Sequence, residues 1–268
     1  MEIDTSRGTS QPTPAVQSLR RPSIIDQAEV ELRRAIFEGT LRPGDSIPEV
    51  QVSSQMGISR SSLREACQRL VRDGLLTQFR GRGLFVTELD PPALLDLLDY
   101  RRAVELQAVS TVAQRVRALR EQGDDDAAAA LLDPARRALE EMSSSLSAGD
   151  LLAAGSADLA LHQMLAEATG NRFLIDAMGT IMILTRLGSF CDPAGFGIAA
   201  DLPGPHASLL NALEDGDAAA ARAALEASLH ELSSRLRTGK HGELLRDPHP
   251  SQPRDPAFPV ITDSGPTV

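Results

Sequence analysis

Aromatic residues are scarce in this chain, which has no tryptophan and only 3% Phe, Trp and Tyr together. Proteins that bind single-stranded nucleic acid stack bases on aromatic rings, so this class is disfavoured. Cys67 and Cys191 are too few for a disulfide framework and are expected to be free thiols. No apolar run approaches the roughly 18 residues that span a bilayer, and no signal-peptide core opens the chain. We therefore expect no membrane partner and a cytoplasmic location.

Positive charge is also in short supply overall, but it is concentrated in one region. The formal net charge is −10, yet residues 58–87 carry six basic against two acidic side chains. Residues 91–239 carry 12 basic against 21 acidic side chains. A chain of 268 residues is long enough for two domains. The contrast predicts one domain that meets a polyanion and a second domain with a different task.

The first ordered region is predicted to span residues 23–90, after a disordered tail over 1–22 that is rich in Ser, Thr, Pro and Gln. Apolar residues at helical spacing predict three helices, over 24–39, 49–56 and 59–73. Ser59 is the expected N-cap of the third helix. Two short strands follow, over 75–79 and 83–89, joined by an Arg-Gly turn. This order is that of a winged helix-turn-helix domain with a small β-hairpin wing.

The second region, residues 91–239, has only helical patterns. Glycine- and proline-rich breaks separate six predicted helices, over 92–119, 125–148, 150–169, 171–190, 205–214 and 217–237. Residues 240–268 are rich in proline and are expected to form a second disordered tail. The predicted fold class is therefore mainly α, with an N-terminal winged helix-turn-helix domain followed by an all-helical bundle.

The helix over 59–73 has two distinct faces. At 100° per residue its apolar face collects Leu63, Ala66, Cys67 and Leu70, and its polar face Arg60, Ser61, Arg64, Gln68 and Arg72. An arginine can donate two hydrogen bonds to guanine or clamp a phosphate. Arg80 and Arg82 flank Gly81 on the turn, as suits a wing tip that approaches a DNA backbone closely. The alternative is a solvated helix face and an ordinary hairpin.

The segment "MGISRSSLREAC" and the later "GLFV" resemble the DNA-binding domain of the GntR family of bacterial transcription regulators. The family pattern is "LGVSRTPVREAL" followed by a wing that ends in "GxFV", and the resemblance covers residues 24–88. Ser62 stands where many members have proline. The resemblance implies binding of a double-stranded DNA operator, with helix contacts from Ser59, Arg60, Ser61 and Arg64. It implies wing contacts from Arg80, Gly81 and Arg82.

Three of the five histidines lie on predicted helices of the acidic region: His162, His206 and His230. Asp158 and His162 are four residues apart and share one helix face. One carboxylate and three imidazoles are a donor set that suits zinc, nickel, manganese or iron. Taken alone, an Asp/His pair at this spacing is more often a surface ion pair, and the spacing does not show that the other two histidines converge on Asp158 and His162.

Residues 93–237 are similar to the FCD ligand-binding domain of FadR-type members of the GntR family. The matching features are the Arg101–Glu105 pair, the segment 158–171, a histidine at 206, and the segment 216–230. The resemblance implies a divalent metal, zinc in the first place, held inside the bundle by Asp158, His162, His206 and His230. Leu161 and Pro205 replace residues that are common beside two of these positions.

The same resemblance implies a homodimer and a small organic acid as effector, with Arg101 as the candidate that binds it. The alternative for Arg101 is an ion pair with Glu105 across one helical turn. The leading hypothesis is thus a ligand-responsive transcription regulator, a repressor, and not an enzyme. Two alternatives are kept: a metal-dependent hydrolase built on the His/Asp site, and a DNA-binding dimer with no effector.

Overall fold

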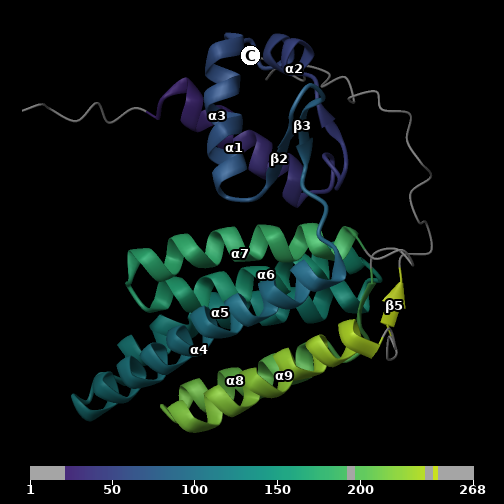
Figure 1. Ribbon diagram of the computed structural model, residues 1–268. Helices are drawn as coiled ribbons and strands as arrows, with labels where there is room; N and C mark the ends of the chain where they lie inside the picture. Colours follow the sequence, from purple (N-terminus) through teal and green to yellow (C-terminus); the bar gives the residue numbers. More distant parts are fainter. Residues whose placement is uncertain (1–21, 192–196, 239–243, 247–268) are drawn as a thin grey trace, which may run out of the picture.

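The computed structural model describes residues 22–191, 197–238 and 244–246, and the protein is described over these ranges. An N-terminal part built from three helices and a small sheet stands on a bundle of long helices (Figure 1). The predicted fold class, mainly α with a winged helix-turn-helix followed by a helical bundle, is confirmed.

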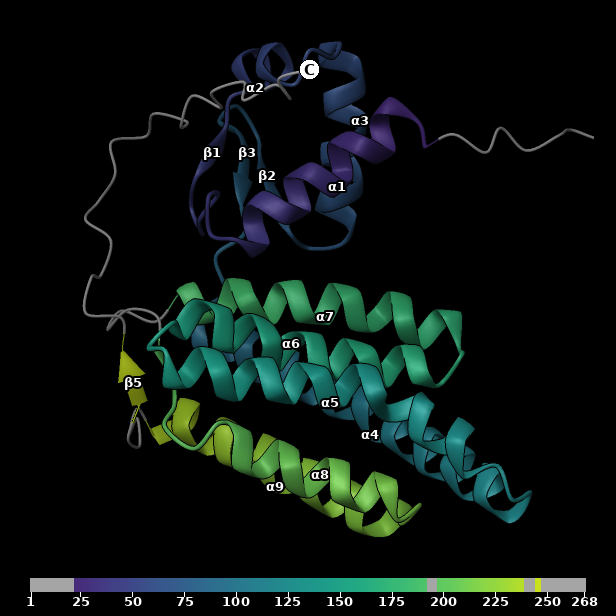
Figure 2. The same cartoon turned by 180° about the vertical axis from the view of Figure 1, so that it is seen from behind.

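The N-terminal part contains α1 (Ile24–Phe37), α2 (Glu49–Gln55) and α3 (Arg60–Arg72). Its antiparallel sheet has the order β1-β3-β2, from β1 (Ser46–Ile47), β2 (Leu76–Phe79) and β3 (Gly83–Val86), and Figure 2 shows it beside α1. Ser59 caps α3 as predicted, because its side chain accepts a hydrogen bond from the Ser62 amide. The predicted apolar face of α3 is fully buried.

The bundle contains six helices in the described part of the chain: α4 (Pro91–Glu121), α5 (Asp125–Ser147), α6 (Leu151–Ala168), α7 (Arg172–Phe190), α8 (Pro203–Glu214) and α9 (Ala218–Thr238). The long α4 packs against each of the other five. The main apolar core lies between α4, α5, α6, α8 and α9. Gly149 and Gly170 end α5 and α6 with positive φ angles of 77° and 68°, which only glycine adopts without strain.

Three short strands were not predicted. β1 has two residues, too few to give a pattern. β4 (Gly197–Ala199) and β5 (Leu244–Arg246) pair in an antiparallel two-stranded sheet. Residues 244–246 lie in the tail that was predicted to be disordered from 240 onward, but they form a strand. The sequence did not predict this strand because pairing with a distant segment leaves no local sequence signal. The tail predicted over 1–22 and the rest of 240–268 lie almost entirely outside the described residues.

Helix α7 corrects the expectation that no apolar run approaches the length that spans a bilayer. Among the described residues it is the helix that is long and apolar enough to cross a membrane by length and composition, with a mean hydropathy of 1.4. In the fold it packs against α4, α6 and α1 instead, and Asp176 and Arg186 interrupt its apolar sequence. In this helix 33% of the apolar window is buried, most of the other residues are half-buried, and Phe173 near its N-terminal end is 74% exposed.

Where α1 meets α7, a side chain from each part of the molecule packs into the apolar core of the other part. Phe37, the last residue of α1, packs against an apolar cluster of the bundle that includes Met178 and Met182. In return, Leu187 of α7 belongs to the core of the N-terminal part and is completely buried. The N-terminal part is thus held on the bundle by packing as well as by the chain connection.

We predict that Leu63→Ala lowers the free energy of unfolding of the N-terminal part by about 2–5 kcal/mol, because it leaves a cavity beneath α3. The control is Val30→Ala on α1, whose side chain is 65% exposed and should change stability by less than about 0.5 kcal/mol. Urea unfolding followed by circular dichroism measures both. Equal effects of the two substitutions would contradict this packing.

Candidate DNA-binding surface and metal centre

All seven side chains or backbone positions predicted to contact DNA are exposed in the structure: Ser59, Arg60, Ser61, Arg64, Arg80, Gly81 and Arg82. We call these seven positions the recognition surface. They come from two places, the N-terminal turn of α3 and the turn between β2 and β3. A hydrogen bond of 3.1 Å between Gln68 and Gln78 links the two elements. The helix and the wing are therefore held in a defined relation.

Two arginines of the recognition surface have partners that the sequence did not indicate. Glu49 of α2 accepts hydrogen bonds from Nε and Nη2 of Arg64, at 3.0 and 2.6 Å. The guanidinium of Arg82 lies over the rings of Phe79 and Phe85, at 5.6 and 5.5 Å from their centroids. Such contacts restrict the orientation of each arginine before any ligand arrives. The aromatic residues on either side of the Arg-Gly turn were the available signal for the second contact.

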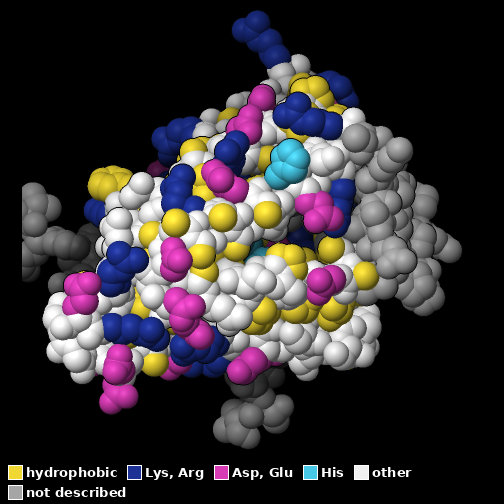
Figure 3. All heavy atoms as spheres, turned by 90° about the horizontal axis from the view of Figure 1, so that it is seen from below, with side chains coloured by type: hydrophobic (Ala, Val, Ile, Leu, Met, Phe, Trp, Pro, Cys, Tyr) yellow, Lys and Arg dark blue, Asp and Glu magenta, His cyan; other side chains and the backbone are white. Residues whose placement is uncertain are grey.

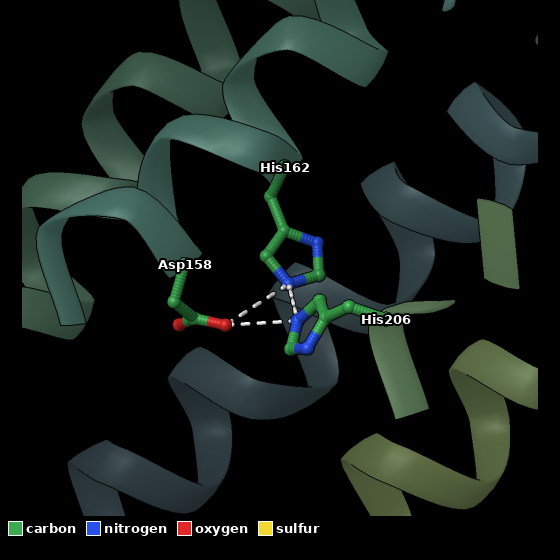
Figure 4. Close-up of side chains that lie close together, drawn as sticks. All are labelled: Asp158, His162 and His206. Carbon is green, nitrogen blue, oxygen red and sulfur yellow. Dashed lines mark hydrogen bonds and ion pairs between the residues drawn. The ribbon is translucent and has the colours of Figure 1, made fainter. Parts of the chain in front are cut away.

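Inside the bundle, Asp158, His162 and His206 point their polar atoms at one common centre (Figure 4). The first two come from α6 and the third from α8. Nε2 of His206 lies 2.8 Å from Oδ1 of Asp158 and 3.2 Å from Nε2 of His162. Nε2 of His162 lies 3.8 Å from the same carboxylate oxygen. Both histidines are buried, with 4% and 6% of their surface exposed.

The far nitrogen of each imidazole is held by a second partner. Nδ1 of His206 lies 2.8 Å from the carbonyl oxygen of Leu202, just before α8. Nδ1 of His162 lies 2.9 Å from Oε2 of Glu105 on α4. Each Nδ1 faces an acceptor oxygen, of Leu202 or of Glu105, so each Nδ1 carries the proton and both Nε2 lone pairs face the centre together with a carboxylate oxygen. Three acceptor atoms at this spacing require a positive charge among them.

This requirement fits a divalent metal ion. Zn–N bonds of about 2.0–2.1 Å at tetrahedral angles place neighbouring ligand atoms about 3.3 Å apart, close to the spacings of 2.8–3.8 Å found here. Without a metal, the positive charge would have to come from a second proton on His206. Burial disfavours the charged imidazole, but the hydrogen bond and the charge of Asp158 outweigh burial and raise the pKa of His206. Burial disfavours the ionised form of Asp158, but the hydrogen bond and the charge of His206 favour it more strongly. The pKa of Asp158 therefore lies well below its ordinary value.

Arg101 and Glu105 form a buried ion pair beside this centre. Nε of Arg101 donates to Oε1 of Glu105, and both side chains are at most 5% exposed. Burial opposes ionisation of Glu105, but the charge of Arg101 and the contacts with Arg101 and His162 keep the pKa of Glu105 below its ordinary value. The pair across one helical turn, considered as the alternative role of Arg101, is therefore present. The charge of Arg101 also lowers the pKa of Asp158, so it acts on the centre.

His230 is not at this centre, which corrects the predicted ligand set. Its side chain is exposed, whereas Leu225 and Leu229 on the same helix are buried. The polar α9 side chain that lines the cavity of about 10 Å³ beside His162 and His206 is Ser228, together with the apolar Ala224 and Leu225. Two residues correspond to about 200° around a helix, so Ser228 and His230 point in opposite directions. The sequence motif predicted the correct helix, but the residue that faces the site lies two positions before the histidine of the motif, on the opposite face of α9.

The surface of the bundle opposite the N-terminal part is shown in Figure 3. It carries acidic and basic side chains around apolar ones and is hollowed near its centre, where a histidine side chain is visible in the depth. The two histidines of the centre formed by Asp158, His162 and His206 are only 4% and 6% exposed, and the cavity that they line has a volume of about 10 Å³.

Comparisons with known proteins agree with this division of the chain. Residues 24–86 match the family model described as "Bacterial regulatory proteins, gntR family", and residues 96–231 match the FCD domain. The chain is 31% identical over 151 residues to the Nta operon transcriptional regulator of Aminobacter aminovorans. That match covers 56% of this chain and 66% of the relative, slightly less than two thirds of its length.

A second relative is matched over most of its length. It is the putative L-lactate dehydrogenase operon regulatory protein of Escherichia coli, 27% identical, with 84% of this chain and 93% of the relative covered. Among solved structures, a putative transcriptional regulator GntR from Rhodococcus sp. RHA1 superposes with a TM-score of 0.66 at 23% identity. It covers 81% of this chain and 99% of its own, and at this identity it supports the fold alone.

We predict that Glu105→Gln destabilises the bundle by about 3–5 kcal/mol, because it leaves Arg101 as an uncompensated buried charge. The control is Glu226→Gln, which breaks the exposed pair with Arg102, where the side chains are 55% and 42% exposed. That change should cost less than about 1 kcal/mol. Thermal and urea unfolding of both variants provide the comparison, and a Glu105→Gln protein as stable as its control would show that the buried pair contributes little.

Proposed function

The chain belongs to the gntR family of bacterial regulatory proteins and carries an FCD domain, and on that premise we propose that it is a FadR-type repressor that senses a small organic acid at a metal centre. The coarser function follows from the family: the chain is a DNA-binding transcription regulator and not an enzyme. The observation that carries the finer proposal is the convergence of Asp158, His162 and His206 inside the bundle.

The recognition surface is proposed to contact the operator. The exposed side chains of Arg60 and Arg64 stand at the N-terminal end of α3, where a recognition helix meets base edges in the major groove. The wing adds Arg80 and Arg82, of which Arg82 is already oriented by two rings. In the absence of DNA, Arg64 forms an ion pair with Glu49. Binding to the operator must therefore replace this ion pair with a contact between Arg64 and DNA.

The metal is proposed to be zinc, held by one carboxylate and two imidazoles, with nickel, manganese and iron as alternatives. When bound, it supplies a centre of positive charge that attracts a carboxylate. Three protein ligands leave at least one position free in a tetrahedral geometry. The cavity lined by His162, His206 and Ser228 has room for about one water molecule or ligand atom beside the residues that would hold the metal. Arg101 remains our candidate to favour an acidic effector, because its charge already acts on Asp158 and His206.

A homodimer is supported by the exposed surface of α7. The N-terminal half of this helix carries Phe173, which is 74% exposed, followed by the half-buried Leu174 and Ile175. An aromatic side chain this exposed beside two further apolar ones is the feature of α7 that suits contact with a partner. We propose that a second copy of the chain covers it, which would also present two recognition helices to one operator.

The alternatives are separated by specific observations. Membership of a family of transcription regulators argues against the alternative of a metal-dependent hydrolase. A DNA-binding dimer with no effector would show no thermal stabilisation by any organic acid, because only a ligand of the native state raises stability. A regulator of this kind acts on the chromosome, so we propose a cytoplasmic location, on the nucleoid when DNA is bound.

We predict that the purified protein contains close to one equivalent of metal, and that His162→Ala and His206→Ala lose it, because each removes one of three ligands. His230→Ala is the matched control and should retain the metal, since that side chain is exposed on the far side of α9. Elemental analysis after metal reloading measures all four proteins. Loss of metal in the His230→Ala variant would contradict the ligand set proposed here.

Arg60→Ala should weaken binding to an operator selected from random DNA by about 1–3 kcal/mol if the side chain reads a base, with little effect on unrelated DNA. The control is Arg120→Ala, the same charge change at an exposed position near the end of α4. Fluorescence anisotropy at fixed salt gives both affinities. An equal loss on operator and unrelated DNA would identify Arg60 as a phosphate contact only.

Phe173→Asp should convert the proposed dimer into a monomer at micromolar concentration, because it places a charge in the covered apolar surface. Val30→Asp on α1 is the control, an exposed apolar residue outside α7. Sedimentation equilibrium gives the mass of each protein. A dimer that survives Phe173→Asp would place the interface elsewhere.

A further inference from the structure

Arg186 is the most deeply buried charged side chain among the described residues, with 1% of its surface exposed. It lies on α7, the helix between the N-terminal part and the rest of the bundle (Figure 1). A cation in such a place is costly unless its neighbours compensate it. The contacts of Arg186 therefore identify the groups that stabilise its buried charge.

On one side, Arg186 touches the N-terminal part. Its guanidinium carbon lies 5.0 Å from the centre of the Phe37 ring, at the end of α1, and 5.8 Å from that of Phe190. The loop after α1 is fitted closely to the same place, since a side chain at Gly39 would lie 2.9 Å from the Phe190 ring. A cation over an aromatic face is attracted by it, and more strongly when water is excluded.

On the other side, Arg186 touches the helix that carries two of the three proposed metal ligands. Its Nη2 atom donates a hydrogen bond of 2.7 Å to Oγ of Ser156 on α6, two residues before Asp158. The negative charge of Asp158 also stabilises the guanidinium. The same cation is therefore held by α6 and its carboxylate and by a ring of the DNA-binding part.

We propose that Arg186 is the positioning residue through which the metal centre acts on the DNA-binding domain. The proposal rests on the metal site proposed above. A divalent ion at Asp158 replaces a negative neighbour of Arg186 with a positive one, which weakens the attraction of the guanidinium to α6. Because Phe37 is held by the same guanidinium, the end of α1 responds to the occupancy of the site.

Energetic coupling of this kind is reciprocal. If metal and Arg186 repel each other, removing the charge of Arg186 must strengthen metal binding. We expect Arg186→Met to bind Zn²⁺ roughly fivefold more tightly than the unaltered protein, at the lower end of typical coupling between sites. Arg186→Lys keeps the charge and should bind Zn²⁺ as the unaltered protein does. A purely structural arginine would change stability in both variants and leave the affinity for Zn²⁺ unchanged.

The experiment uses the full chain and Zn²⁺ alone as the probe. Competition with a chromophoric chelator gives the affinity of each variant, and hydrogen exchange with and without Zn²⁺ follows the amides of Glu38, Gly39 and Leu41 at the end of α1, which are hydrogen-bonded to α1. Phe37→Leu is a further variant: it keeps the charge and removes the ring. It should retain the affinity for Zn²⁺ and lose the Zn²⁺-dependent change in exchange.

The outcomes separate the inference from the function it rests on. Tighter Zn²⁺ binding by Arg186→Met, together with loss of the exchange response in Phe37→Leu, supports the proposal. Unchanged affinity in a folded Arg186→Met protein overturns it while leaving the metal site intact. If Arg186→Met does not fold, an unchanged exchange response in Phe37→Leu overturns it instead. Absence of Zn²⁺ binding in the unaltered protein overturns the metal site and the coupling together.

Discussion

Three acceptor atoms that meet inside the bundle need a positive charge among them, and this need sets the arrangement of the side chains around them. Asp158, His162 and His206 meet within 3.8 Å, with each imidazole turned inward because its other nitrogen is held elsewhere. Glu105, which orients His162, is in turn compensated by Arg101. Side chains from α4, α6 and α8 are thus committed to one centre, and the charge that satisfies it, a proton or a metal ion, affects all three helices.

The connection from this centre to DNA is short. Helix α6 carries two proposed ligands and touches Arg186, which touches the last residue of α1, and α1 packs against the recognition helix α3. Phe37 and Leu187 cross the boundary between the two parts in opposite directions. A small displacement of α6 therefore has a packed route to the DNA-binding part, because well-packed interfaces transmit displacement instead of absorbing it.

The sequence predicted the helices well because their signals are local. Ser59 as a cap and the two faces of α3 follow from spacing alone, and the breaks at Gly149 and Gly170 follow from the conformation that ends a helix. The site was predicted in part. Asp158 and His162 share one turn, but His230 was assigned by motif and is exposed, because a motif does not fix which face of α9 is turned inward. Arg186 carried no signal, since its partners lie on α1 and α6.

The most direct test of the central claim is the affinity for Zn²⁺ of the full chain, measured free and saturated with operator DNA. If the metal centre and the DNA-binding surface are coupled, the two affinities must differ, by about fivefold or more if the coupling is of typical size. The account predicts such a difference, and predicts that Arg186→Met reduces it. Equal affinities for Zn²⁺ in the free and DNA-bound protein would contradict the account, because two sites without a coupling free energy cannot regulate each other.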